Sequence, residues 1–178
     1  MNYYAIQVKT RSEKKFIKLF NALYPDISLP IHFLQRQLDI RKSGKVKKQS
    51  LPVFPGYLFI EASSDEELKE YQWEFRRTEG FYRFLKSNKE ITPLANSDLE
   101  LVLHFLNSSG LAGRSKVYFN ENERIVVVEG PMSGLEGRII KVDKRKCRAK
   151  IKLDLYDDTF AIDLAFDVIG SMEPVKRK

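Results

Sequence analysis

Apolar residues along the first 106 positions follow two spacings, one typical of strands and one typical of helices. Short aromatic and aliphatic runs predict strands at residues 3–8, 31–40, 53–60 and 81–85. Apolar residues at i, i+3, i+4 and i+7 predict helices at residues 13–24 and 65–76, and a third helix that follows Ser97. This order of strands and helices favours an α+β domain in which helices pack on an antiparallel sheet.

Polar residues at the predicted helix starts support these boundaries. Ser12 can cap the first helix, and Pro25 helps to end it. Two further serines each precede a glutamate by three positions, which is the pattern of a capping box. These pairs are Ser64 with Glu67 and Ser97 with Glu100.

The remainder of the chain contains only short strand-like segments. They lie at residues 125–128, 138–143, 147–153, 160–164 and 168–172. A sheet of five short strands must curl to hide one face and protect its edges, which predicts a small β-barrel. Residues 107–113 are small and polar without a periodic pattern, which marks a domain boundary. We therefore predict a domain at 1–106, a linker at 107–122 and a barrel at 123–178.

The composition excludes several classes of function. With 178 residues, 43% of them hydrophobic and 31% charged, the chain is typical of a globular protein. It has no apolar run long enough to span a membrane and no signal-peptide pattern, so we expect a cytoplasmic protein. One cysteine and two histidines give no zinc-ligand spacing, and we expect neither a metal nor a cofactor. Phosphate-binding loops, nucleophile elbows and metalloprotease motifs are missing, so we expect a binding protein without a catalytic residue.

Positive charge is concentrated in one predicted hairpin of the barrel. The chain carries a net charge of +7, and residues 138–152 alone contain eight lysines and arginines against one acid, Asp143. Such clusters suit contact with the phosphates of a nucleic acid. The candidate RNA-binding residues are Lys141, Lys144, Arg145, Lys146, Arg148 and Lys150. Alternation along this segment also fits a solvated basic strand face, and both interpretations remain open.

A second basic segment, residues 41–48, surrounds Ser43 and Gly44. We expect an exposed, mobile loop there, which either contacts nucleic acid or is simply solvated.

A glycine-rich turn separates the first two strands of the predicted barrel. Gly130 and Pro131 must leave the first strand sharply, and Gly137 begins the next strand, where a side chain is expected to clash. The valines before Gly130, together with Gly137 and the Ile139-Ile140-x-Val142 run, resemble the KOW motif of NusG-type transcription factors and some ribosomal proteins.

The N-terminal residues make the resemblance specific. Tyr3-Tyr4-Ala5-Ile6-Gln7 followed by Glu13-Lys14-Lys15 resembles the opening strand and helix of the NusG N-terminal (NGN) domain. Phe54-Pro55-Gly56-Tyr57 is similar to that family's Phe-Pro-Gly-Tyr segment, and Gly80-Phe81 to its later Gly-Phe. Ser97-Asp98 before the last helix, then a linker and the KOW motif, completes the order. The resemblance covers nearly the whole chain.

The resemblance to the NusG family implies a fold and a function. The expected fold is α+β, with a ferredoxin-like NGN domain followed by a small five-stranded SH3-like KOW barrel. The implied function is transcription elongation and antitermination, through docking on the clamp helices of the largest subunit of RNA polymerase. Tyr4, Phe54 and Tyr57 match the family's polymerase-binding positions, and we expect solvent-facing aromatics there. Because Phe54 and Tyr57 lie in an apolar run, the residues alone favour a place in the core.

Two departures from the family pattern bear on which member this is. The loop that carries Phe-Gly-Arg in NusG, used for contact with the ribosome or with Rho, reads Tyr156-Asp157-Asp158 here, which puts both partners in doubt. The basic hairpin is also more cationic than in a housekeeping NusG. Both changes favour a specialised paralogue, similar to LoaP or RfaH, that antiterminates selected operons. We expect it to be a monomer and to contact nascent RNA. The alternative is an RNA-binding or ribosome-associated KOW protein that acts independently of polymerase.

Overall fold

The computed structural model describes residues 1–85 and 91–170, which form two compact units. The first unit consists of residues 1–35 and 52–110, and the second of residues 36–51 and the chain from 111 onward. The units differ from the predicted domains, because a segment within the first 106 residues belongs with the C-terminal part of the chain.

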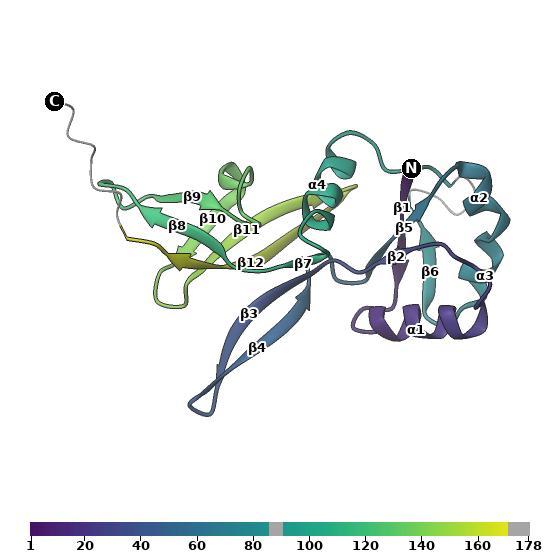
Figure 1. The fold of residues 1–178 in the computed structure, drawn as a ribbon, viewed down its shortest axis with the longest axis horizontal. Helices are drawn as coiled ribbons and strands as arrows, with labels where there is room; N and C mark the ends of the chain where they lie inside the picture. The colour runs from purple at the N-terminus through teal and green to yellow at the C-terminus, as the bar shows by residue number, and fades with distance from the viewer. Residues whose placement is uncertain (86–90, 171–178) are drawn as a thin grey trace. The chain divides into compact units, whose positions relative to one another are not determined.

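An antiparallel sheet of four strands, in the order β2-β5-β1-β6, forms the centre of the first unit (Figure 1). The strands are β1 (Asn2–Val8), β2 (Ile31–His32), β5 (Tyr57–Ala62) and β6 (Phe81–Phe84). The helices are α1 (Glu13–Leu23), α2 (Asp65–Glu70), α3 (Gln72–Arg77) and α4 (Asn96–Leu106). Among the described residues, no helix has the length and apolar character needed to cross a membrane.

Alternate residues of a strand point to opposite sides of a sheet. Consecutive residues of β1 and β5 are buried, so helices cover both faces of this sheet. On one face Tyr4 and Ile6 of β1 join a core with Phe16 and Phe20 of α1 and Phe75 of α3. On the other face α4 covers the sheet, and Figure 1 shows it opposite α2 and α3. The α+β prediction, with helices on an antiparallel sheet, is confirmed.

The predicted helix caps have mixed outcomes. The Ser64 hydroxyl accepts a hydrogen bond of 3.3 Å from the Glu67 N–H, as predicted, although the predicted helix 65–76 divides at Tyr71 into α2 and α3. The prediction of a capping box at Ser97 is wrong. The helix α4 already begins at Asn96, so Ser97 lies inside the first turn, and Ala95 occupies the N-cap position without a side-chain bond.

The basic segment 41–48 belongs to a β-hairpin and not to a loop. Strand β3 (Gln35–Lys42) and strand β4 (Lys45–Pro52) pair beside β7 (Leu111–Ala112) in a three-stranded sheet. Ser43 and Gly44 form the turn with φ angles of 51° and 75°, a conformation typical of tight hairpins. The sequence lacked the signal for β4, because most of its residues are polar and exposed.

A second sheet of five strands, in the order β10-β11-β12-β8-β9, forms most of the second unit. The strands are β8 (Ser115–Phe119), β9 (Ile125–Glu129), β10 (Ile139–Asp143), β11 (Arg148–Leu155) and β12 (Asp158–Val168). Four of the five predicted strands are present as β9, β10, β11 and β12. The fifth strand of the sheet is β8, which was not predicted. Strand β8 lies in the predicted linker 107–122 and pairs in parallel with β12, which ends at Val168. Met172, in the predicted last strand, lies outside the described residues.

Gly130 and Gly137, the two glycines predicted to shape the turn after β9, have different roles. Gly130 has a φ of +105°, and a Cβ there would lie 2.7 Å from the Ser115 Cα, so only glycine fits. Pro131 follows it and is buried. Gly137 lies in a 3₁₀ turn, Glu136–Arg138, where a Cβ would meet nothing within 4 Å. The predicted clash at Gly137 is therefore wrong.

We expect Gly130→Ala to lower the free energy of unfolding by at least about 2 kcal/mol, because it combines backbone strain with overpacking against Ser115. Gly137→Ala is the matched control, and we expect a change within about 0.5 kcal/mol because the site is open. Differential scanning calorimetry of the full chain measures both. Equal effects of the two substitutions would contradict this account of the turn.

Candidate protein and nucleic-acid interfaces

The Phe54-Pro55-Gly56-Tyr57 segment is a tight turn that enters β5. The Gly56 N–H donates a hydrogen bond of 2.7 Å to Oε1 of Glu13, a carboxylate that is only 3% exposed. The Gly56 carbonyl accepts the Val8 N–H at 2.8 Å. Gly56 has a φ of +83°, and a Cβ there would lie 2.9 Å from Oγ1 of Thr10. The turn is therefore held between α1 and the end of β1, and it requires glycine.

The three aromatic side chains predicted to face solvent are buried, so that expectation is wrong. Tyr4 and Phe54 are 1% exposed and Tyr57 is 3% exposed. Phe54 lies edge-on to Phe59 and Phe105, with ring centroids 5.8 and 6.1 Å away, because it faces the side of the sheet that α4 covers. The core alternative was the correct one for Phe54 and Tyr57. A part in polymerase binding stays a prediction for all three, and in this conformation it would be indirect.

Tyr4 lies on the opposite face of the sheet from Phe54. Its hydroxyl donates a short hydrogen bond to Asp65, which also accepts one from Asn2 at 2.8 Å. Burial, followed by the bond to Asp65, raises the pKa of Tyr4 to about 12. The same hydroxyl lowers the pKa of Asp65. Tyr4 therefore links β1 to the start of α2 inside the unit.

An apolar hollow of about 530 Å³ lies between the edge strand β2 and α4. The side chains of Tyr3, Ile31, His32, Phe33, Leu103 and Leu106 line it, together with Asn107, Ser109 and Gly110. Nε2 of His32 lies 2.9 Å from Oε2 of Glu61, and the Tyr3 ring lies 6.3 Å from the His32 ring. Burial and then the nearby Glu61 raise the pKa of Tyr3. Sequence reasoning missed this hollow, because its residues come from three separate segments.

The structure brings four of the six candidate RNA-binding residues together around a shallow pocket of about 150 Å³. Lys141, Lys146, Arg148 and Lys150 line it, with Asp143 and Asp163. Strands β10 and β11 supply most of this surface, and Asp143 lies opposite Arg148 in their register. The Asp143 carboxylate accepts the Lys146 N–H at 2.9 Å, and this bond is the main cause that lowers its pKa. We call this pocket the β10–β11 surface.

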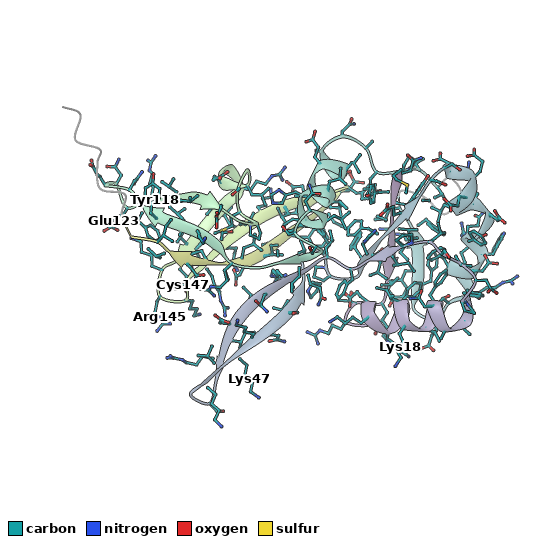
Figure 2. The ribbon with its side chains drawn as sticks, in the orientation of Figure 1. Lys18, Lys47, Tyr118, Glu123, Arg145 and Cys147 are labelled. Atoms are coloured by element: carbon teal, nitrogen blue, oxygen red, sulfur yellow. The ribbon has the colours of Figure 1, made fainter. Side chains whose placement is uncertain are left out.

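The other two candidates lie outside this pocket. Lys144 pairs with Glu123 at 3.1 Å and lies 4.5 Å from the centre of the Phe119 ring. Arg145 lines a neighbouring cleft, and Figure 2 shows it with Cys147 at the end of the β10–β11 hairpin. Lys150 lies 3.8 Å from Asp163 of β12. Acids from β12 and from the turn between β8 and β9 therefore offset part of the charge excess that the sequence shows in residues 138–152.

Within residues 1–85 and 91–170, no group of three histidine, cysteine, aspartate or glutamate side chains could hold a metal ion. Cys147 has a φ of 50°, and its Sγ lies 3.5 Å from the Lys144 carbonyl, so its place is structural within the turn. Tyr156 and Asp157 form the turn between β11 and β12, where the family resemblance expects a Phe-Gly-Arg loop.

Known proteins resemble this chain in both sequence and fold. The model of the NusG family, described as transcription termination factor nusG, matches residues 1–103. The transcription termination/antitermination protein NusG of Helicobacter pylori strain J99 is 26% identical over 178 residues, covering 95% of this chain and 97% of that protein. The protein of the same name from Thermus thermophilus is 27% identical over 159 residues, covering 85% and 80%.

A solved structure of Thermotoga maritima NusG supports the fold. It superposes with a TM-score of 0.53 and 17% identity, and the match covers 92% of this chain and 93% of that one. This similarity confirms the expected fold class, in which the curled five-stranded sheet fits a KOW-like barrel.

We expect Tyr4 to remain protonated until well above pH 10. Because its pKa is raised in the folded state, its contribution to stability is complete below about pH 10 and is lost as the pH rises to about 12. Alkaline titration of the phenolate absorbance should include a late tyrosine step near pH 12. In Tyr4→Phe this late step should disappear while the other steps remain. A titration in which all tyrosines of the folded wild type ionise together near their ordinary pKa would contradict the assignment.

Proposed function

The chain belongs to the NusG family, and from this premise we propose that it is a transcription termination/antitermination factor that binds RNA polymerase and nascent RNA. The observation that carries the proposal is the family match over residues 1–103, which spans the strands and most of the helices of the first unit. NusG-family factors act by binding and not by catalysis. The match on the first unit also favours polymerase binding over an RNA-binding KOW protein that acts alone.

We propose the apolar hollow between β2 and α4 as the surface that docks on the clamp helices of the largest polymerase subunit. Its half-buried aromatic and leucine side chains, among them Phe33 and Leu106, are of the kind that carries most of the energy of a protein interface. A hollow of this type suits the apolar face of a helix. Phe54 lies behind its α4 wall, in contact with Phe105.

In this scheme Tyr4, Phe54 and Tyr57 act as positioning residues. Phe54 and Tyr57 hold the sheet face under α4, and Tyr4 holds β1 against α2. A factor that bridges the polymerase clamp keeps it closed, which disfavours paused states and so reduces termination.

The β10–β11 surface is the proposed contact for nascent RNA. Lysines and arginines that neutralise phosphates release counterions, so the affinity depends strongly on salt. Lys141 is exposed, so a phosphate can replace the water around it. Lys150 lies 3.8 Å from Asp163, and a phosphate can replace this long ion pair. This added surface fits a specialised paralogue. We do not include the ribosome or Rho as partners, because Asp157 and Asp158 reverse the charge of the family's contact loop.

We expect Leu106→Glu to weaken polymerase binding by more than about tenfold, because it places a charge in the hollow that the partner must desolvate. Leu23→Glu is the matched control. Leu23 lies on α1 and is 52% exposed, so we expect no effect. Pull-down of purified RNA polymerase with the full chain measures both, and circular dichroism checks folding. Wild-type binding by a folded Leu106→Glu variant would exclude the hollow. If the wild type binds RNA but no polymerase, the alternative function holds.

We expect the double substitution Lys141→Gln and Lys150→Gln to weaken binding to an RNA hairpin from the leader of its own operon by about tenfold. The slope of log affinity against log salt should fall by about 0.7 to 0.9 for each phosphate that the variant no longer neutralises. Lys18→Gln with Lys69→Gln, on exposed positions of α1 and α2, is the control of equal charge. Fluorescence anisotropy at several salt concentrations measures the effect. An unchanged affinity and slope would remove the RNA contact from the proposed function.

A further inference from the structure

A cleft of about 570 Å³ lies within the second unit, between the β3–β4 hairpin and the turn that joins β10 to β11. Asp39, Ile40, Arg41 and Val46 line one wall, and Arg114, Arg145, Lys146, Cys147 and Arg148 line the other. Five of these nine side chains are cationic and one is acidic. The hairpin and the turn are more than ninety residues apart in the sequence, so only the fold creates this site.

Arg114 joins the two walls of the cleft by hydrogen bonds. Its Nη1 donates to Asp39 at 2.9 Å, its Nε to Asp167 at 2.7 Å and its Nη2 to the Phe166 carbonyl at 2.6 Å. Arg148 donates a second bond across the cleft, to the Asp39 carbonyl. Asp39, the acid of the cleft, is therefore already occupied by Arg114. The hairpin and the barrel present their cations as one fixed surface.

Two cations of the cleft, Arg41 and Arg145, are available to a ligand. Among the residues that the structure describes, neither Arg41 nor Arg145 makes an ion pair, and both are exposed. Half-buried Arg36 lies close to Arg148; burial is the main cause that lowers its pKa, the charge of Asp163 raises it, and the charge of Arg148 lowers it. Five cationic side chains along one cleft, with Asp39 already paired to Arg114, favour the arrival of an anion.

The lining of the cleft also indicates how a ligand would be held. Its apolar residues are Ile40 and Val46, and none of its lining residues is aromatic, so it offers no platform for base stacking. Arginines fork onto phosphate oxygens in pairs of hydrogen bonds. Lys45, Lys47 and Lys48 continue the positive charge along the exposed strand β4, where Figure 2 labels Lys47. The site therefore suits a sugar-phosphate backbone and not exposed bases.

We propose that this cleft binds the phosphodiester backbone of the same RNA that contacts the β10–β11 surface. The β3–β4 and β10–β11 hairpins then contact one RNA together. The proposal rests on the RNA contact of the proposed function and extends it to the β3–β4 hairpin. Lys146 and Arg148 line both the cleft and the β10–β11 surface, so the two sites are continuous. Contacts to phosphates add affinity and set the register, while base contacts elsewhere supply sequence selectivity.

The test compares single variants of the full chain, Arg41→Gln and Arg145→Gln, one on each wall of the cleft. Each should weaken binding of the leader RNA hairpin by about three- to tenfold and lower the salt slope by about 0.7 to 0.9. Arg41→Lys keeps the charge and should lose less affinity than Arg41→Gln. Lys18→Gln, on α1 of the first unit, is the control and should have no effect.

A crosslinking experiment gives a second and independent readout. Val46→p-benzoylphenylalanine puts a photoreactive group in the cleft, and Leu23→p-benzoylphenylalanine puts one at an exposed position at the end of α1 in the first unit. The first should crosslink to the RNA hairpin on irradiation, and the second should not. Equal crosslinking at both positions would overturn the proposal.

The outcomes separate this proposal from the proposed function. If Lys141→Gln with Lys150→Gln weakens RNA binding but Arg41→Gln does not, the RNA contact stands and the cleft is overturned. If none of these variants changes RNA affinity, both fail. A single-stranded and a duplex DNA of the same sequence form a further arm of the test. A loss of affinity at Arg41→Gln that appears with DNA but not with RNA would overturn the assignment to RNA.

Discussion

The buried hydrogen bond from the Gly56 N–H to the Glu13 carboxylate joins the turn before β5 to the first turn of α1. A buried carboxylate is tolerated only when it is hydrogen-bonded, and a buried N–H needs an acceptor, so each group depends on the other. With the bond from Val8 to the Gly56 carbonyl, this contact determines where β5 begins against β1. The register that follows places Gln7 opposite Tyr57 and decides which face each residue of β5 occupies. Phe54, just before this strand, is buried against Phe105 of α4, and Tyr57, its first residue, is buried too.

The second unit depends on a comparable close approach. Gly130 lies against Ser115, whose hydroxyl accepts the Met132 N–H at 2.9 Å, and this contact fixes the chain after β9 beside β8. Strand β8, the first strand of this sheet in the sequence, then pairs in parallel with β12, the last one. The antiparallel pairing of β11 with β12 places Asp163 opposite Lys150, and the turn between β8 and β9 brings Glu123 to Lys144. The charge of the basic hairpin is therefore a property of the whole sheet.

The two units carry different kinds of candidate binding surface. The first unit presents an apolar hollow whose lining includes Phe33 and Leu106, and it suits a protein partner. The second unit gathers cations from two hairpins around surfaces that lack aromatic side chains, and it suits the backbone of a nucleic acid. Segment 36–51 is inserted in the sequence of the first unit but belongs to the second, so the basic cleft is assembled from both parts of the chain.

The sequence alone determined the features that depend on local pattern. Helix α1 ends within one residue of its predicted limit, because Phe16 and Phe20 give a helical period that no distant contact has to supply. The need for glycine at position 130 and the family resemblance were also visible in short segments. Only the tertiary structure decided which apolar residues face solvent, since an aromatic residue such as Phe54 has the same local sequence pattern in a core and in an interface. Strand β4, the apolar hollow and the acids beside the basic hairpin likewise escaped prediction. Pairing, burial and charge balance there depend on segments far apart in the sequence, which a local pattern does not contain.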